Sequence, residues 1–322
     1  RILCSRRIEG KNKAMPQMTE LERINVPQTK AADFDVFWAE TKKRCETVPL
    51  NVKGDTQTDV CDLTFEGLDG TPIHTWLLLP PEAKERKVPV VVHCHGADRS
   101  RGKPEHFSAW LAAGFAVISP DFRLQGGTTG SNTLFDGDGT SGWWTLNLND
   151  LPRYYMFCVW TDFLRAVRLA LATPEIDSAR IAVSGHSQGG GVALGLAALD
   201  RSVALCMADV PSSCWMEQRI LTRSGGGAGI DDYLAAFPER AEIVHRNLST
   251  FDNINHAPQI NCPVLVSVGM QDIICPPECT YAAYNKIRSP KEMAVYPQAG
   301  HEGGREVHLA RKLGFLQRHF GK

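Results

Sequence analysis

One stretch of this 322-residue chain, residues 180–194, constrains its fold more than any other. It begins with four residues typical of a buried strand, continues through the Gly-x-Ser-x-Gly sequence of Gly185, Ser187 and Gly189, and ends in small residues typical of a helix. This strand–turn–helix context is that of a nucleophile elbow, a turn so tight that side chains at 185 and 189 would meet neighbouring backbone. Ser187 is therefore a candidate nucleophile; the alternative is an ordinary Gly-Ser-Gly turn.

Segments that favour strands and segments that favour helices alternate through most of the chain. Apolar runs predict buried strands at 88–94, 115–119, 180–183, 203–208, 264–268 and 292–296. Helices are predicted at 107–113, 154–172, 277–287 and 305–320. This alternation predicts an α/β fold with a mostly parallel, doubly wound sheet and helices on both faces.

The N-terminal part adds elements before this alternation begins. The pattern predicts an amphipathic helix over residues 27–45 that docks its aromatic face on the domain. It then predicts a β-hairpin whose strands, 60–66 and 72–79, are joined by a turn at 67–71. We expect residues 1–17 to be an extension that is either disordered or foreign to the natural protein.

Two later segments interrupt the alternation. Residues 124–152 are rich in Gly, Asn, Thr and Asp, which predicts a long loop. After the strand Val203–Ala208, residues 211–258 are predicted to form an irregular insertion, with a helix at 231–247, of the kind that usually covers a site. We expect residues 18–322 to form a single domain that includes this insertion.

Composition excludes several classes of protein. The formal net charge is −1, so no overall field attracts nucleic acid or an anionic membrane, and no apolar run approaches the ~20 residues of a membrane-spanning helix. The ten cysteines lack the pairing of a disulfide scaffold, so reduced thiols are expected. Cys275 and Cys279 lack a second ligand pair at zinc spacing and are interpreted as packing residues.

The N-terminal sequence bears on localisation. Residues 1–17 contain no apolar stretch of signal-peptide length, which favours the cytoplasm. The chain begins with Arg1 rather than Met, so a signal already removed, and hence secretion, stays open.

A serine nucleophile needs a base to take its proton and an acid to orient that base. On such a sheet the partners follow the serine in the order acid, then histidine, each on a loop after a strand. Asp272 follows the strand at 264–268, and His301 follows the strand at 292–296. A single loop Asp or His is usually a turn former or a solvated side chain. Their shared order predicts Ser187, Asp272 and His301 as a catalytic triad.

The oxyanion of an acyl-transfer intermediate needs two backbone N–H donors. Gln188, directly after the nucleophile, supplies the first. The strand that ends in His93-Cys94-His95-Gly96 leads into a turn and nominates Ala97 for the second. The rival interpretation, a metal held by His93 and His95, lacks a third ligand in the sequence.

Three tryptophans lie in loops that flank the predicted sheet. Trp143, Trp144 and Trp215 are candidates for stacking on a sugar ring. The alternative is that they anchor loops to the core.

From about Met18 onward the chain resembles carbohydrate esterase family 7, the acetyl xylan esterases and cephalosporin C deacetylases. The matching runs are Asp33–Trp38, Ser187–Gly191, Ala208–Pro211, Cys262–Leu265, Cys275–Pro277, Ala282–Asn285 and Gly300–Gly304. The resemblance implies an α/β-hydrolase that removes acetyl groups from small acetylated sugars and xylo-oligosaccharides without a cofactor. It also implies the same triad and an assembly of copies, often a hexamer.

Two positions depart from the family pattern. The family's Arg-Gly-Gln motif appears as Arg123-Leu124-Gln125, and Ala97 stands where the family usually has tyrosine. If position 97 contributes only its N–H, the oxyanion hole survives while the pocket wall loses an aromatic face. The alternatives to an acetylesterase are a peptidase or other acyl hydrolase on the same scaffold, and a non-catalytic hydrolase-fold binding protein.

Overall fold

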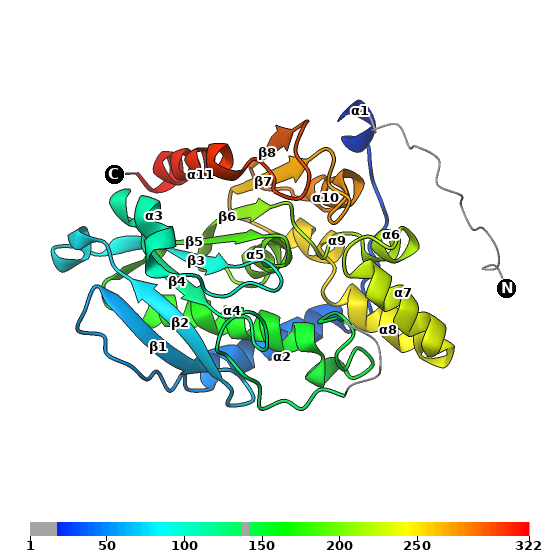
Figure 1. The fold of residues 1–322 in the computed structure, drawn as a ribbon, viewed down its shortest axis with the longest axis horizontal. Coiled ribbons are helices and arrows are strands. Elements are labelled where there is room, and N and C mark those ends of the chain that lie inside the picture. The colour runs from blue at the N-terminus through cyan, green and yellow to red at the C-terminus, as the bar shows by residue number, and fades with distance from the viewer. Residues whose placement is uncertain (1–17, 137–141, 322) are drawn as a thin grey trace.

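The computed structural model describes residues 18–136 and 142–321, and the extension predicted at 1–17 lies outside them. An eight-stranded sheet, ordered β1-β2-β4-β3-β5-β6-β7-β8, forms the centre of the molecule (Figure 1). Its strands are β1 (Val60–Glu66), β2 (Pro72–Leu78), β3 (Val88–Cys94), β4 (Ala116–Pro120), β5 (Ile176–His186), β6 (Val203–Asp209), β7 (Val264–Gly269) and β8 (Lys291–Tyr296). The α/β-hydrolase fold and the predicted β-hairpin are confirmed.

The strands from β3 onward pair in parallel, whereas β1 and β2 form an antiparallel edge. Successive side chains of a strand point to opposite faces, so a strand covered on both faces is apolar throughout. On β3, Val90 and Val92 belong to one buried cluster and Val91 belongs to the other. The sheet therefore separates two cores, as a doubly wound fold requires.

Helices cover both faces of the sheet, with α2 and α4 on one side in Figure 1 and α3 and α11 on the other. Those flanking the sheet are α2 (Phe34–Thr47), α3 (Ser108–Ala112), α4 (Tyr155–Ala172), α5 (Gln188–Leu199), α10 (Pro277–Tyr284) and α11 (Arg305–Phe320). The others are α1 (Met18–Leu21) and, in the insertion, α6 (Met216–Leu221), α7 (Gly227–Ala236), α8 (Ala241–Ser249) and α9 (Asn253–His256). No helix of the described residues has both the length and the hydropathy to cross a membrane.

Two predicted helix boundaries were wrong. The helix expected at 27–45 begins only at Phe34. The residues before it extend along α9, where the Thr29 N–H donates to Asn255 Oδ1 (2.8 Å) and the Gln28 side chain donates to Asn255 O (3.2 Å). The helix expected at 231–247 is two helices, α7 and α8, separated at Pro238. Proline lacks an N–H and disfavours helical backbone at the preceding residue, here Phe237, whose φ is −131° and ψ 64°.

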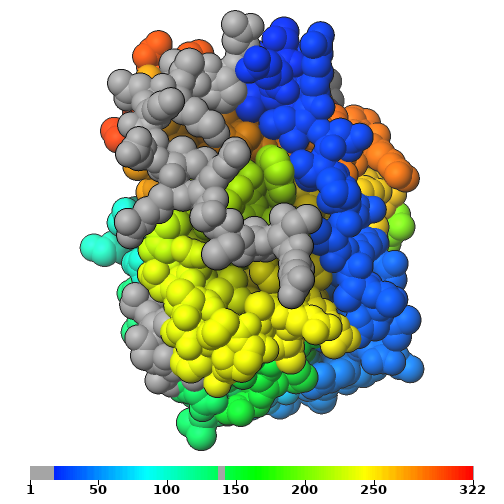
Figure 2. Space-filling view, turned by 90° about the vertical axis from the view of Figure 1, so that its right-hand side faces the viewer, coloured from blue at the N-terminus to red at the C-terminus, as the bar shows by residue number. Residues whose placement is uncertain are grey.

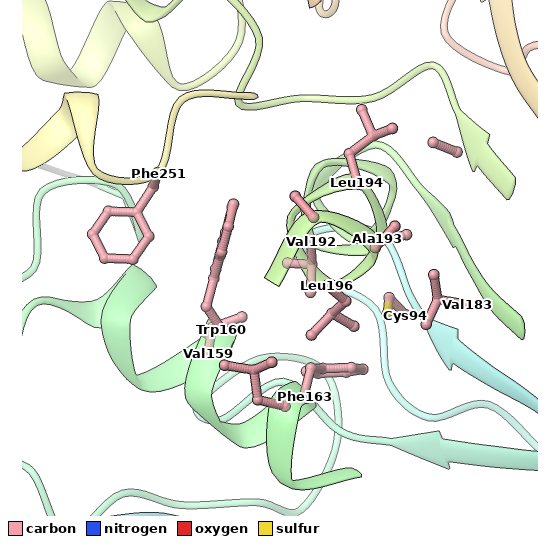
Figure 3. Packing of buried hydrophobic residues seen from close by; sticks show 14 of the residues in the cluster. Cys94, Val159, Trp160, Phe163, Val183, Val192, Ala193, Leu194, Leu196 and Phe251 are labelled. Atoms are coloured by element: carbon pink, nitrogen blue, oxygen red, sulfur yellow. The ribbon is translucent and has the colours of Figure 1, made fainter. Parts of the chain in front are cut away.

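The helix that follows the elbow, α5, is fixed by close packing against α4. Val192 and Leu196 of α5 face Val159 and Phe163, and the indole of Trp160 stands beside them (Figure 3). A Cβ at Gly195 would lie 2.1 Å from that indole, so glycine is needed there for the two helices to approach. This packing sets the direction of α5, and with it the aim of its first N–H groups.

The insertion gathers on the side of the molecule shown in Figure 2. That view shows α7 and α8 (yellow-green to yellow) beside the N-terminal segment (dark blue). The segment before α6 is tied down by Asp252, whose carboxylate accepts the N–H groups of Trp215 (2.9 Å) and Met216 (2.7 Å). Asp252 therefore joins the end of the insertion to its beginning. The insertion also meets the segment that follows β7, since a Cβ at Gly225 would lie 2.9 Å from Ile274 O.

Candidate active site

The elbow has the strained backbone that its sequence predicts. Ser187 has φ 56° and ψ −115°, outside the regions that most residues occupy. Its N–H donates to Asp209 O (2.9 Å), and its C=O accepts from Ser212 N (2.9 Å). A Cβ at Gly185 would lie 2.2 Å from Gly189 O, and one at Gly189 would lie 2.0 Å from Cys94 O. Both glycines are therefore required by the close approach of backbone.

The structure brings the three predicted triad residues into one hydrogen-bonded chain. Ser187 Oγ lies 2.8 Å from His301 Nε2, and His301 Nδ1 lies 2.8 Å from Asp272 Oδ2. The other carboxylate oxygen, Asp272 Oδ1, accepts the N–H groups of Ile274 and Cys275, each at 2.8 Å. A carboxylate held on both oxygens fixes the plane of the imidazole and leaves Nε2 free to take the serine proton.

The surroundings of His301 favour its protonated form. Burial of the ring disfavours the charge, but the Asp272 carboxylate and the Cys275 thiol outweigh burial and raise the pKa of His301 to about 9. A base of this strength takes a hydroxyl proton readily, although it must itself be neutral to do so.

The two expected oxyanion donors adjoin the nucleophile. Gln188 is the first residue of α5, so its N–H has no partner within that helix. Ala97 lines a cavity of about 850 Å³ together with Ser187 and His301. The turn before it is close to the serine, since a Cβ at Gly96 would lie 4.0 Å from Ser187 Cβ. An acyl oxygen in this cavity is within reach of helix N-terminal N–H groups and their positive dipole end.

A second cavity, of about 910 Å³, borders the acid rather than the nucleophile. It is lined by Asp272, Trp215 and Met270, and Ser187 is not part of its wall. It is slightly larger, but we assign the reaction to the 850 Å³ cavity because only that one contains the nucleophile and the base.

The histidine pair that suggested a metal is engaged in other bonds. His95 Nε2 accepts the N–H of Phe122 (2.8 Å), and its Nδ1 donates to Gly96 O (2.7 Å). His93 Nδ1 donates to Ser119 Oγ (3.2 Å), and burial is the largest cause that lowers the pKa of His93 to about 3. Both rings line the 850 Å³ cavity as neutral groups at neutral pH, and the ring nitrogens of His95 are both taken by the protein.

The Arg-Leu-Gln motif holds the segments around the site in place through hydrogen bonds. Arg123 is buried and donates through Nε (2.8 Å) and Nη2 (2.7 Å) to Asp162 of α4, and through Nη1 (2.8 Å) to Asp69 of the hairpin turn. Gln125 Oε1 accepts the N–H of Asp98 (2.9 Å), next to Ala97. Arg123 thus joins the hairpin to α4, and Gln125 fixes the loop that carries one oxyanion donor.

The departure at Leu124 has a conformational cost. Leu124 has φ 61°, the left-handed region in which glycine is favoured, and its side chain is 38% exposed. The glycine of the family pattern suits this backbone, and the leucine adopts the same region under strain.

The three candidate sugar-stacking tryptophans lie in different places. Trp143 stacks on Tyr155 (5.5 Å between ring centroids) and donates Nε1–H to Asp98 (2.7 Å), so it lies over the oxyanion loop. Trp215 lines the 910 Å³ cavity. Trp144 packs on Gly226, where a Cβ would lie 2.2 Å from the indole, which fits an anchoring role. None of the three lines the cavity that contains Ser187.

Sequence reasoning missed Cys275. It was interpreted as a packing residue, but its thiol, an Asp272 carboxylate oxygen and a ring nitrogen of His301 lie within 4.8 Å of one another. The signal was its position three residues after the candidate acid. The nine cysteines of the described residues are buried and form no disulfide, as expected.

Comparisons with known proteins agree with this geometry. The profile of the acetyl xylan esterase (AXE1) family matches residues 11–319, a range that includes all three triad residues. The acetyl esterase Axe7A of Xylanibacter ruminicola is 29% identical over 301 residues, which cover 89% of this chain and 67% of that protein.

Two solved structures are similar over almost their whole length. The acetyl xylan esterase of a Paenibacillus species has a TM-score of 0.88 at 33% identity, with 94% of this chain and 100% of that chain covered. Acetyl xylan esterase 1 of a Thermoanaerobacterium species has a TM-score of 0.86 at 28% identity, with 94% and 98% covered.

Proposed function

The chain belongs to the acetyl xylan esterase family, and from this premise we propose that it is a serine esterase that removes acetyl groups from acetylated xylan fragments and other small acetylated sugars. The observation that carries the proposal is the continuous chain Ser187–His301–Asp272, with 2.8 Å at each of its two hydrogen bonds. The Paenibacillus and Thermoanaerobacterium relatives named as acetyl xylan esterases support the substrate class.

The reaction follows from these contacts. His301 Nε2 takes the Ser187 proton as Oγ attacks the acetyl carbonyl carbon, and Asp272 stabilises the imidazolium that forms. The N–H groups of Gln188 and Ala97 hold the oxyanion, each such donor being worth about 3 kcal/mol. His301 then gives its proton to the departing sugar oxygen. Water, deprotonated by the same ring, clears the acetyl group from Ser187.

The test is an activity panel on wild type, Ser187→Ala and Ser202→Ala. Ser202 is a matched control because it hydrogen-bonds Asp200, outside the site. We expect wild type and Ser202→Ala to release acetate from p-nitrophenyl acetate and acetylated xylan, and Ser187→Ala to lose about 10⁶-fold in kcat. Unchanged hydrolysis by Ser187→Ala contradicts the nucleophile assignment.

The same panel separates the rival activities. It includes longer acyl esters and a peptide amide, because fold alone does not fix the substrate. Faster turnover of the amide than of acetate favours a peptidase, and no turnover of any substrate by wild type favours a non-catalytic binding protein.

A further inference from the structure

A buried positive charge lies behind the catalytic base. Arg219 on α6 is 1% exposed, and its Nε and Nη1 have no hydrogen-bond partner among the described residues. The guanidinium is tightly enclosed, since a Cβ at Gly225 would lie 2.6 Å from Nη2. A buried cation is costly unless an anion lies beside it.

The groups with the largest electrostatic influence on Arg219 are thiols. They belong to Cys275, Cys279 and Cys214, and they raise the pKa of the guanidinium against the effect of burial. Burial raises the pKa of Cys214 and Cys279, which keeps them neutral. At Cys275 burial also opposes ionisation, but Arg219 and His301 outweigh it and lower the pKa of the thiol.

Cys275 connects this cation to the triad. Its N–H donates to Asp272 Oδ1 (2.8 Å), and its Sγ lies within 4.8 Å of both an Asp272 oxygen and a ring nitrogen of His301. Arg219 lies beside the segment that leads into Cys275, since a Cβ at Gly225 would lie 2.6 Å from Arg219 Nη2 and 2.9 Å from Ile274 O. Both Arg219 and His301 act on the Cys275 thiol, and His301 in turn hydrogen-bonds Ser187. A negative charge on Sγ would stabilise Arg219 and the protonated ring at the same time.

We propose that Cys275 is held as a thiolate by the buried guanidinium of Arg219, and that it acts with Asp272 as a second anionic support for the imidazolium of His301. Cys275 is then a positioning residue, since it touches neither the substrate nor the reacting atoms. The contribution of Cys275 to catalysis rests on the proposed esterase reaction at Ser187. The ionisation of its thiol does not depend on that reaction.

The other titratable and charged groups near this cluster come from several elements. His186 lies with its ring centroid 5.1 Å from that of His301, and burial is the largest cause that lowers its pKa, so it is neutral. The acidic groups with electrostatic influence on the cluster are Asp252, Glu278 and Glu302. Among the cations, Lys312 acts on His186 and Arg305 acts on Glu302. The positive charges that lower the pKa of the Cys275 thiol are Arg219 and the protonated ring of His301.

The ionisation is tested without substrate. The ultraviolet absorbance of thiolate is measured at neutral pH for folded and denatured wild type, Cys275→Ala and Cys279→Ala. An ordinary thiol, with a pKa of about 8.5, is mostly protonated at this pH, so unfolding should abolish the native signal. We expect about one thiolate per chain in wild type and Cys279→Ala, and none in Cys275→Ala. An identical spectrum for folded wild type and Cys275→Ala overturns the proposal.

The link to the base is tested by the pH profile of kcat/KM on p-nitrophenyl acetate. Removing an anion beside the imidazolium should lower the pKa of His301, so Cys275→Ala and Cys275→Ser should move the acid limb to lower pH by about one unit, a tenfold change in proton affinity. Cys279→Ala should leave the limb in place.

Substitutions of Arg219 test whether its positive charge stabilises the thiolate. Arg219→Met should abolish the thiolate absorbance, whereas Arg219→Lys, which keeps the positive charge, should retain it. If Cys275 had a purely structural role, its substitution would lower kcat/KM at every pH without moving the acid limb of the pH profile. That result overturns the positioning role. Should the variants fail to fold, the folded-minus-denatured spectrum of wild type alone decides whether the thiolate exists.

Discussion

Gln125 Nε2 lies 3.1 Å from Gln188 Oε1, so the Arg-Leu-Gln motif contacts the nucleophile elbow directly. The same Gln125 side chain accepts the N–H of Asp98 and donates to the hydroxyl of Tyr155 (2.7 Å). One amide therefore spans the two segments that supply the oxyanion donors. The spacing between those donors depends on a residue that itself touches no reacting atom.

Gln125→Ala is expected to lower kcat on p-nitrophenyl acetate by about tenfold with little change in KM. The substitution removes hydrogen bonds worth about 1 kcal/mol each and loosens the geometry of the oxyanion hole. Steady-state kinetics measure the effect. Gln317→Ala, at an exposed position on α11, is the matched control, and an equal loss in that variant would count against a specific role.

Two substitutions at position 97 distinguish the role of the backbone N–H from that of the side chain. Ala97→Pro removes the N–H and should reduce kcat by about 10²-fold, as expected for loss of one oxyanion donor. Ala97→Tyr retains the N–H and should keep the rate on p-nitrophenyl acetate within about threefold of wild type, since the donor is intact. Comparable losses in the two variants would contradict the assignment of this donor. Acetylated sugars measured in parallel report the effect of the added aromatic face.

The pH dependence of activity follows from the pKa of His301, which is raised to about 9. The ring must be neutral to accept the serine proton, so kcat/KM should rise as pH increases through this value. Asp272→Asn removes the carboxylate and should shift the limb to lower pH while lowering kcat by about 10⁴-fold. A wild-type limb below pH 6.5, the usual range of histidine, would show that the two anionic neighbours do not act on the ring.

Leu124→Gly should stabilise the protein. A left-handed leucine costs roughly 1–2 kcal/mol, and glycine returns about 0.5–1 kcal/mol of that through its greater freedom in the unfolded chain. The expected net gain in free energy of unfolding is about 0.5–1 kcal/mol, measurable by urea denaturation. Leu134→Gly is the control: Leu134 is an exposed loop leucine without positive φ, so this substitution should destabilise. A loss of stability in Leu124→Gly would show that the leucine side chain contributes packing that outweighs its strain.

Much of the fold was predictable because periodicity reports burial. Segments such as 88–94 and 203–208 are almost entirely apolar because both faces of their strands are covered, and the structure places them inside the sheet, away from its edges. The break between α7 and α8 is also encoded in the sequence, because Pro238 lacks an N–H and disfavours helical backbone at Phe237.

The candidate site was predictable to the extent that it lies at strand ends. Asp272 and His301 follow their strands directly, so chain order alone placed them together. The position of Trp144 was not predictable, because its contact with Gly226 depends on how the insertion folds back. The place of Cys275 beside the base was not predictable for the same reason. Its partner Arg219 lies in α6, and no local pattern predicts that a helix of the insertion places a guanidinium behind the base.

The strained backbone of Ser187 has a consequence for the order in which this chain becomes an enzyme. Its N–H and C=O are held by Asp209 and Ser212, which belong to β6 and the segment directly after it. The nucleophile therefore acquires this support only when β6 has docked beside β5. Recovery of esterase activity during refolding thus reports the pairing of two strands across the intervening helix α5 rather than the local formation of a turn.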